Sequence, residues 1–312
     1  MVGIVNIVTG ATQGIGLAIA ESIACHTLWS SSNNQHHLFI VGRNKERGQQ
    51  AVEKIRKACS TQNVYFEPCD LSDYNDVLNL QERISKQVND DSFRVNCLVN
   101  NAAECPKRQI IIERPKRDGT TQQVDKQFAT NVLGYHFMMK VFHDHFFHVS
   151  DDTCQNDISS TTTSDTTYVL NVASNWAGDL DLKDVSFLRR GYDNDSAYRQ
   201  SKQCDRMLTK IWSDKLQEEG KYNVKVNSCH PGEPKTKLSV DLGYNMYSPT
   251  ATRQMIESQT PIPYLCGLKG NLQVTGGWFG GHSDKPSSCR FMKMTTESQQ
   301  LYDMCEEFCY SS

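Results

Sequence analysis

The 312-residue sequence contains no run of 18 consecutive apolar residues, so no transmembrane helix is expected. The segment from Met1 to Val8 has no basic region and no small-residue cleavage site, and a secretory signal is therefore not expected either. Instead, this segment has the apolar pattern of a buried strand. Together these absences predict a cytoplasmic protein.

The sequence also lacks an excess of charge of either sign. Its formal net charge is −3. Proteins that bind nucleic acid through bulk charge usually carry a large positive excess, so we expect no nucleic-acid partner. Hydrophobic residues make up 38% and charged residues 22% of the chain, which is typical of a globular protein rather than a disordered one.

No two of the 12 cysteines form a CxxC pair, the spacing that many zinc and redox sites use. Secreted disulfide scaffolds are usually shorter and denser in cysteine. We therefore expect reduced thiols, most of them buried as small apolar side chains. His143, His145 and His148 stand close together, but no cysteine or carboxylate lies near them at zinc spacing, so no metal site is predicted.

Short apolar runs alternate with helical stretches along the chain. The runs are rich in Val, Ile and Leu, as expected for strands that are buried on both faces. We predict strands at residues 3–8, 38–42, 63–67, 95–99, 168–172, 223–229 and 272–275. We predict helices near residues 14–27, 45–60, 72–89, 119–148, 196–219 and 250–268. This order predicts an α/β fold: a Rossmann-like, doubly wound parallel sheet of about seven strands with helices on both faces, in three α/β/α layers.

No domain boundary and no internal repeat interrupts this alternation. The whole chain, residues 1–312, is therefore predicted to form one NAD(P)-binding Rossmann-like domain. Three polar segments have the composition of surface insertions, near residues 29–36, 104–118 and 150–167. Such segments usually lie in solvent.

A glycine-rich turn from Thr9 to Gly16 follows the first predicted strand and precedes the first predicted helix. Gly10 permits a tight turn, and Gly14 and Gly16 allow a phosphate to approach the backbone. Free N–H groups and the helix dipole would then face the anion. An ordinary strand-to-helix turn is the alternative, but the flanking elements favour a pyrophosphate site. The predicted cofactor contacts in this turn are Gly10, Thr12, Gln13, Gly14, Ile15 and Gly16.

Arg43 follows the second predicted strand, where an NAD site places an acidic residue for the ribose 2′-hydroxyl. A guanidinium fits the 2′-phosphate of NADP instead. Lys45 and Arg47 follow, and a solvated basic helix start is the alternative. Because basic charge is unfavourable at a helix N-terminus, the pattern favours a ligand. The sequence therefore predicts NADP(H) in preference to NAD(H).

Two further segments follow predicted strands. Asp70 and Leu71 come after the third strand, and Asn100 and Ala102 come after the fourth. Open α/β sheets bind ligands at the carboxyl ends of their strands, so we predict that both segments contact the cofactor. Capping of the next helix is the alternative for Asp70.

Tyr198 and Lys202 stand four residues apart and share one face of a predicted helix. A free phenol has a pKa of about 10. A neighbouring ammonium would lower that pKa and allow the phenol to exchange a proton near neutral pH. Taken alone, a surface pair at this spacing is the alternative.

In their order and spacing, these segments resemble the short-chain dehydrogenase/reductase family over nearly the whole chain. The resemblance is carried by Thr9 to Gly16, Asp70, Asn100 to Ala102, Asn131, Ser174, Tyr198, Lys202, Pro231, Gly232 and Thr236. The stretches 128–134 and 274–279 resemble the retinol-dehydrogenase-like branch, which usually prefers NADP. Ala103 departs from the family, which commonly has glycine at that place.

The resemblance implies four catalytic residues. Tyr198 would be the acid/base, and Lys202 would lower its pKa and bind the nicotinamide ribose. Ser174 would hydrogen-bond the substrate carbonyl oxygen, and Asn131 would hold a water for a proton relay to Lys202. The resemblance also implies three further cofactor contacts, Pro231, Gly232 and Thr236.

We therefore predict an oxidoreductase that uses NADP(H) to interconvert a carbonyl and an alcohol on a small apolar substrate. The segment from Glu233 to Tyr247 is predicted to be an apolar lid, with an amphipathic helix on the core as the alternative. Two other functions stay open: reduction of a carbon–carbon double bond, and a non-catalytic NADP-binding scaffold or redox sensor. The resemblance also implies a homodimer that pairs through the helices near 119–148 and 196–219.

Overall fold

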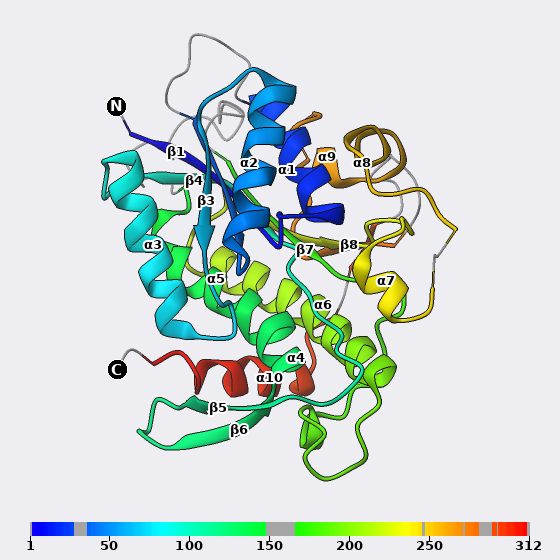
Figure 1. The fold of residues 1–312 in the computed structure, drawn as a ribbon. Coiled ribbons are helices and arrows are strands. Elements are labelled where there is room, and N and C mark those ends of the chain that lie inside the picture. Colours follow the sequence, from blue (N-terminus) through cyan, green and yellow to red (C-terminus); the bar gives the residue numbers. More distant parts are fainter. Residues whose placement is uncertain are drawn as a thin grey trace.

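The computed structural model describes residues 2–27, 36–147, 166–244, 247–270, 272–280, 289–291 and 293–310. It contains an eight-stranded sheet that is covered by helices on both faces (Figure 1). The predicted insertions at 29–36 and 150–167 lie outside the described residues except at their ends, where His36 and Thr167 begin strands. The prediction that residues 1–312 form one domain stays a prediction.

The large sheet confirms the predicted fold class, with one strand more than predicted. Its order is β10-β9-β8-β7-β4-β1-β2-β3. Its strands are β1 (Ile4–Thr9), β2 (His36–Gly42), β3 (Val64–Pro68), β4 (Arg94–Asn100), β7 (Thr167–Val172), β8 (Val224–Cys229), β9 (Gly277–Phe279) and β10 (Cys289–Phe291). Neighbouring strands are parallel except for the antiparallel pair β9–β10. The winding reverses between β1 and β4, and open sheets bind ligands at such a point.

Helices pack on the two faces of this sheet and form two separate hydrophobic cores. On one face lie α3 (Tyr74–Val88), α5 (Gly134–Phe142), α6 (Asn194–Glu218) and α10 (Thr296–Glu306). On the other lie α1 (Gly14–Thr27), α2 (Lys45–Cys59), α8 (Arg253–Gln259) and α9 (Ile262–Leu265). The remaining helical elements are α4 (Lys126–Phe128), the π-helical turn η1 (Ala129–Leu133), the 3₁₀ turns η2 (His143–His145) and η5 (Leu182–Asp184), and α7 (Lys237–Asp241).

Alternation within each strand explains why the runs of apolar residues are nearly continuous. In β1, Ile7 belongs to the core beneath α3, α5 and α6, whereas the next residue, Val8, belongs to the core beneath α1 and α2. Successive strand residues point to opposite faces, so a strand covered on both faces must be apolar at both sets of positions.

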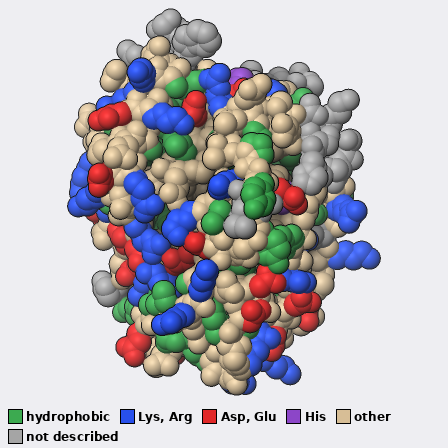
Figure 2. Space-filling view, turned by 45° about the vertical axis from the view of Figure 1, so that its right-hand side comes forward, with side chains coloured by type: hydrophobic (Ala, Val, Ile, Leu, Met, Phe, Trp, Pro, Cys, Tyr) green, Lys and Arg blue, Asp and Glu red, His purple; other side chains and the backbone are tan. Residues whose placement is uncertain are grey.

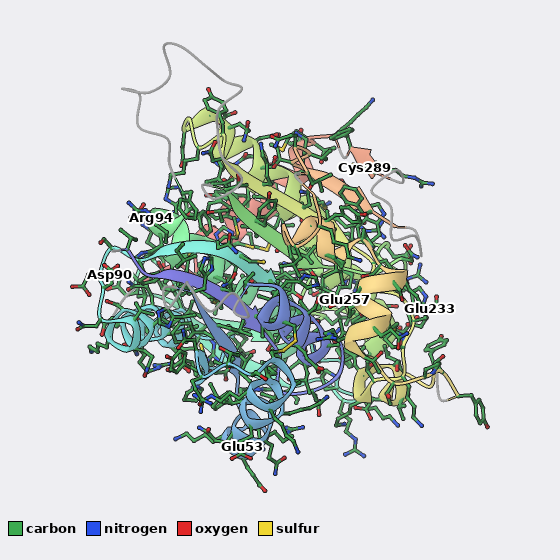
Figure 3. The ribbon with its side chains drawn as sticks, turned by 90° about the horizontal axis from the view of Figure 1, so that it is seen from above. Glu53, Asp90, Arg94, Glu233, Glu257 and Cys289 are labelled. Atoms are coloured by element: carbon green, nitrogen blue, oxygen red, sulfur yellow. A yellow bond between two sulfur atoms is a disulfide. The ribbon has the colours of Figure 1, made fainter. Side chains whose placement is uncertain are left out.

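A polar contact joins two of the helices on one face of the sheet. Glu257 of α8 points toward α1, where it accepts a hydrogen bond from Ser22 (Figure 3).

The predicted start of a helix at residue 119 is corrected by a β-hairpin, which begins within the predicted insertion at 104–118; that the segment is an insertion stays a prediction. Strands β5 (Ile111–Pro115) and β6 (Thr121–Asp125) pair antiparallel, and the helical segment begins only at Lys126. The turn contains Asp118, whose carboxylate accepts from Thr120, and Gly119, whose φ is +81°. An Asp-Gly pair is a strong hairpin signal, and it outweighs the helical propensity of the following residues.

Two predictions near the C-terminal end are also corrected. The helix predicted at 250–268 is divided into α8 and α9 at Pro261, because a proline disfavours helix at the residue before it. The strand predicted at 272–275 lies at Gly277–Phe279 instead. The side chain of Asn227 bonds both Val274 O and Gly277 N, so ordinary pairing with β8 begins after that contact.

The expectation that all cysteines are reduced is wrong for one pair. Cys25 and Cys59 form a disulfide across 34 residues of sequence, with their Cα atoms 4.9 Å apart. Cys25 lies in the last turn of α1 and Cys59 is the last residue of α2, and these helices pack side by side. The packing of the two helices, rather than any sequence spacing, brings the two sulfur atoms together.

Helix α10 was not predicted, and a buried polar network attaches it to α5 and α6. Trp212 donates from Nε1 to Nδ1 of His136, so the proton of the neutral imidazole lies on Nε2 and is donated to Glu306 (2.9 Å). Burial lowers the pKa of His136, which keeps the ring neutral. Lys140 donates to the other oxygen of Glu306 at 2.8 Å. Burial would raise the pKa of Glu306, but these two partners outweigh burial and lower it to about 2.

We expect Glu306→Gln to reduce the free energy of unfolding at pH 7 by about 1–3 kcal/mol, because it removes the charge from two hydrogen bonds. A carboxyl whose pKa is lowered on folding stabilises above its unfolded pKa of 4.5, and that stabilisation is lost as pH falls through 2. The difference from wild type should therefore shrink between pH 5 and pH 2. Urea unfolding over this range measures it.

The matched control is Glu307→Gln, since Glu307 pairs with Lys116 but its side chain is 52% exposed. Exposed pairs contribute little, so this variant should stay within about 1 kcal/mol of wild type. Equal losses in both variants at pH 7 would contradict the anchoring role of Glu306.

Helix α10 also bears on the predicted homodimer. Figure 1 shows α10 below α5 and beside the β5–β6 hairpin, where Arg117 N donates to Glu307 O. Tyr302 of α10 packs against both His136 and Trp212, so α10 covers part of the surface of α5 and α6. Pairing through these helices stays a prediction.

Among the described residues, no helix combines the length and the apolar composition that a transmembrane span requires.

Candidate active site

A cleft of about 590 Å³ opens where the winding of the sheet reverses, at the carboxyl ends of β1 and β4. Its volume lies in the range of small-molecule sites. Most of the predicted cofactor contacts line it: Gly10, Thr12, Gln13, Gly14, Ile15, Gly16, Arg43, Asp70, Leu71, Ala102, Tyr198, Lys202, Pro231 and Thr236.

A second, smaller hollow of about 80 Å³ adjoins the cleft. The predicted residues Ser174 and Gly232 line it. Tyr198 lines both hollows, together with Ile15, Ala173, Pro231, Thr236 and Leu238. The phenol therefore stands on the wall between a large cleft and a small one.

The glycine turn is held against β4 by Asn101, which carries part of the family resemblance but was not among the predicted cofactor contacts. Asn101 donates from Nδ2 to the carbonyl oxygens of Thr9 (2.9 Å) and Gly10 (3.4 Å). In return, Thr9 Oγ1 accepts from the backbone N–H of Asn101 at 2.9 Å and of Ala102 at 3.1 Å. These bonds fix the turn at the switch point of the sheet.

Two glycines in this turn are required by its close packing. Gly10 has a φ of +65°, and a Cβ there would lie 2.7 Å from Ala102 Cα. A Cβ at Gly16 would lie 2.4 Å from Asn101 Nδ2 and 2.6 Å from Gly10 O. The turn leads directly into α1, whose N-terminus faces the cleft with the positive end of its dipole. This arrangement fits a pyrophosphate.

The far end of the cleft carries two guanidinium groups. Arg43 pairs with Glu104 at 2.9 Å, and Arg47 donates to Gln13 at 3.1 Å. Arg43 is about half exposed, so its guanidinium can reach a ligand in the cleft. On the face drawn in Figure 2, basic and acidic side chains are interspersed rather than separated into patches of one sign. The positive charge at the site therefore comes from Arg43 and Arg47 individually and not from an excess of basic residues over this face.

Asn131 lies in η1 and is completely buried. Its Nδ2 donates to Glu104 O (3.0 Å) and Ser201 Oγ (3.1 Å), and its Oδ1 accepts from Glu104 N (2.9 Å). Asn131 therefore ties the segment after β4 to α6. It is not one of the residues that line either hollow.

The side chains of Tyr198 and Ser174 lie near each other, and Ser174 opposes the rise that burial causes in the pKa of Tyr198. Ser174 follows β7, and Tyr198 lies in the first turns of α6, so the end of a strand and the start of a helix bring the two hydroxyls together. Both groups face the small hollow.

Lys202 is almost completely buried, and its ammonium lies 5.8 Å from the centre of the Tyr198 ring. It donates to Asp205 Oδ2 and to Val172 O, both at 2.9 Å, and to the Tyr135 hydroxyl at 3.4 Å. The predicted lowering of the pKa of Tyr198 by Lys202 is not observed. Burial raises this pKa above its ordinary value, and the negative charge of Asp205 raises it further.

Asn100 points away from the cleft. It is fully buried and donates to Asn171 Oδ1, and its neighbour Asn101 lines the cleft instead. Sequence reasoning therefore chose one residue of the pair and missed the other. Glu104 and Asp205 were also missed. The Arg43–Glu104 ion pair joins residues that follow separate strands, so it leaves no local pattern in the sequence. The i,i+3 spacing of Lys202 and Asp205, in contrast, was a visible signal.

The predicted lid is partly described. Within Glu233–Tyr247, α7 is a five-residue helix that begins at Thr236 with a reciprocal capping box to Ser239. Leu238 lines both hollows, and Figure 3 places Glu233 toward the edge of the molecule. Tyr244 packs edge-on against Trp176, with ring centres 4.3 Å apart. Residues 245–246 of the predicted lid lie outside the described residues.

Comparison with known proteins agrees with this geometry. The family model for short chain dehydrogenases matches residues 5–156. Retinol dehydrogenase 13 of Mus musculus is 27% identical over 296 residues, which cover 90% of this chain and 77% of that protein. Two solved structures show the same fold at 18% identity. One, a short chain dehydrogenase of Escherichia coli CFT073 complexed with NADPH, has a TM-score of 0.58 and covers 89% of this chain and 95% of its own.

The other is a short chain dehydrogenase of Burkholderia cenocepacia J2315 in complex with NADP, with a TM-score of 0.57 and coverage of 88% of this chain and 94% of its own. The fold and the position of the cleft at the switch point of the sheet are those of a Rossmann-type domain. More narrowly, the chain is similar to the short-chain dehydrogenases over residues 5–156, and it is 27% and 25% identical to the retinol dehydrogenase 13 proteins of Mus musculus and Homo sapiens.

Proposed function

We propose that the protein is an NADP(H)-dependent oxidoreductase that interconverts a carbonyl and an alcohol on a small apolar substrate. The observation that carries this proposal is the position of Tyr198. Tyr198 lines both hollows, and Ser174 beside it lines the small one. A proton donor at this place can serve a substrate in the small hollow while a cofactor fills the large one.

The glycine turn and the N-terminus of α1 would hold the pyrophosphate, and Arg43 would bind the 2′-phosphate. Asp70 would contact the adenosine half from the end of β3, and Pro231 and Thr236 would close the opposite side. The NADP complexes of the two related folds support this choice of cofactor. When bound, NADPH supplies a hydride to the carbonyl carbon.

In this direction, negative charge would develop on the carbonyl oxygen of a substrate in the small hollow. Tyr198 then donates its proton to that oxygen, and Ser174 donates a hydrogen bond that stabilises the developing negative charge. In the opposite direction, the Tyr198 phenolate accepts the proton of the alcohol. Lys202 keeps a positive charge beside these groups, and Asn131 holds the segment after β4 against α6.

The lining of the small hollow supports an apolar substrate. Trp176, Tyr244, Leu238 and Leu242 surround it, and the rings of Trp176 and Tyr244 contact each other. Aromatic and aliphatic walls with a few convergent polar groups are typical of sites for small organic molecules. The relative from Mus musculus is named as a retinol dehydrogenase, and retinol is itself an apolar alcohol.

The proposal is tested by the oxidation of NADPH in the presence of a panel of aldehydes and ketones, with NADP⁺ and alcohols for the reverse reaction. We expect turnover of apolar aldehydes or ketones and formation of the matching alcohol. A product reduced at a carbon–carbon double bond would favour the first alternative function. Tight binding of NADPH without turnover across the panel would favour the scaffold or sensor.

A further inference from the structure

Asp205 is unusual because it is a charged residue that is completely buried in the middle of a helix. It lies on α6 one turn after Lys202, and none of its surface is exposed. Its Oδ2 accepts from the Lys202 ammonium at 2.9 Å, but its Oδ1 has no hydrogen-bond partner among the described residues. Burying a carboxylate oxygen without a partner is costly, so Asp205 has a strong effect on its surroundings.

The contacts of Lys202 show what this effect is. An ammonium has three donors, and those of Lys202 point to Asp205, to Val172 O and to the Tyr135 hydroxyl. Tyr198 is not among these partners. The negative charge 2.9 Å from the ammonium also offsets the positive field that would otherwise act on the phenol.

We propose that Asp205 is a positioning residue for proton transfer, which holds the Lys202 ammonium and sets the pH range in which Tyr198 can exchange its proton. This inference rests on the proposed function. While Asp205 is charged, the Lys202–Asp205 pair is neutral and the phenolate of Tyr198 is disfavoured. A neutral side chain at position 205 leaves the ammonium uncompensated, and the phenolate is then favoured.

The other ionisable groups around Asp205 do not carry charge at neutral pH. Tyr135 faces it from α5, Cys305 faces it from α10, and Cys204 precedes it on α6. Burial holds the pKa of each of these groups well above its ordinary value, and Asp205 adds to that shift. Burial also raises the pKa of Asp205 itself, to about 7, although Lys202 lowers it. Proton binding at Asp205 near neutrality therefore changes the charge next to Tyr198.

The test is the pH dependence of kcat/KM for alcohol oxidation with NADP⁺, in wild type and Asp205→Asn. In this profile, kcat/KM rises with pH as Tyr198 loses its proton, and we call this rise the Tyr198 limb. The limb should lie at least about one pH unit lower in Asp205→Asn than in wild type. The matched control is Asp214→Asn, the same substitution on the same helix, where the partner is Lys210. It should leave the limb where wild type has it.

Asp205→Glu keeps the charge and should also keep the limb in place, even if the rate falls. A merely structural role for Asp205 would lower stability or rate without moving the limb. An unmoved limb in Asp205→Asn that still binds NADPH, or an equal shift in Asp214→Asn, would overturn the proposal.

Asp205→Asn leaves a buried ammonium without its counter-charge, which is destabilising. Asp205→Ser is the second neutral variant, because its smaller side chain leaves room for a water beside Lys202, and it should show the same shift. If neither variant folds, a displaced limb in Asp205→Glu would contradict the proposal. Absence of any NADP-dependent turnover in wild type would instead reject the proposed function, so the two failures are distinguishable.

Discussion

Tyr198→Phe should reduce kcat for carbonyl reduction by roughly 10²–10⁴-fold and leave the Kd for NADPH within about threefold of wild type. The substitution removes only the hydroxyl, which is the group proposed to transfer the proton, from a residue that lines the small hollow. The ring itself, which packs in the wall between the hollows, is retained. Steady-state kinetics and fluorescence titration of NADPH measure the two quantities separately.

Tyr135→Phe is a suitable control for Tyr198→Phe. Tyr135 is buried, its hydroxyl contacts the same ammonium at 3.4 Å, and it lines neither hollow. Loss of that hydroxyl should therefore change kcat far less than loss of the Tyr198 hydroxyl. Full turnover in Tyr198→Phe, or equal losses in the two variants, would reject Tyr198 as the acid/base.

Arg43→Asp should lower the ratio of kcat/KM for NADPH over that for NADH by about 100-fold or more. The substitution removes a charge-assisted contact to the 2′-phosphate and places a carboxylate beside it, and both changes act against NADPH alone. The ratio is the informative quantity, because a general loss of activity would lower both terms equally.

The Arg43–Glu104 ion pair provides the matched control. In the structure Glu104 accepts a hydrogen bond from Arg43 Nη2, so a 2′-phosphate has to compete with this carboxylate for the guanidinium. Glu104→Gln keeps the shape and removes the competing charge, and it should strengthen NADPH binding and raise the same ratio. An unchanged ratio in Arg43→Asp would show that Arg43 does not contact the 2′-phosphate.

Most of the sheet could be predicted from sequence because its central strands, such as β1 and β7, are buried on both faces and must be largely apolar. Elements whose position depends on contacts between side chains far apart in the sequence could not be predicted in this way. The strand at Gly277–Phe279 is displaced by the Asn227 side chain, and α10 is held by His136 from a helix that ends more than 150 residues earlier. The β5–β6 hairpin is different, since Asp118 and Gly119 gave a local signal for it.

The same division holds for the site. Gly10, Arg43 and Tyr198, which line the cleft, could be singled out from sequence, because backbone geometry, ligand charge and acid/base chemistry require particular residue types at particular places. Asp205 was not singled out, because an aspartate three residues after a lysine on a helix usually forms a solvated ion pair with it. Only its complete burial, with one oxygen unpaired among the described residues, gives it a chemical role.

The most direct test of the central claim follows a label rather than a rate. NADPH carrying deuterium at C4 of the nicotinamide is incubated with an aldehyde or ketone that the protein reduces, and the product is analysed by mass spectrometry and NMR. The account predicts one deuterium on the carbinol carbon. Product that lacks the label, or carries it on a carbon of a former double bond, would contradict hydride transfer to a carbonyl.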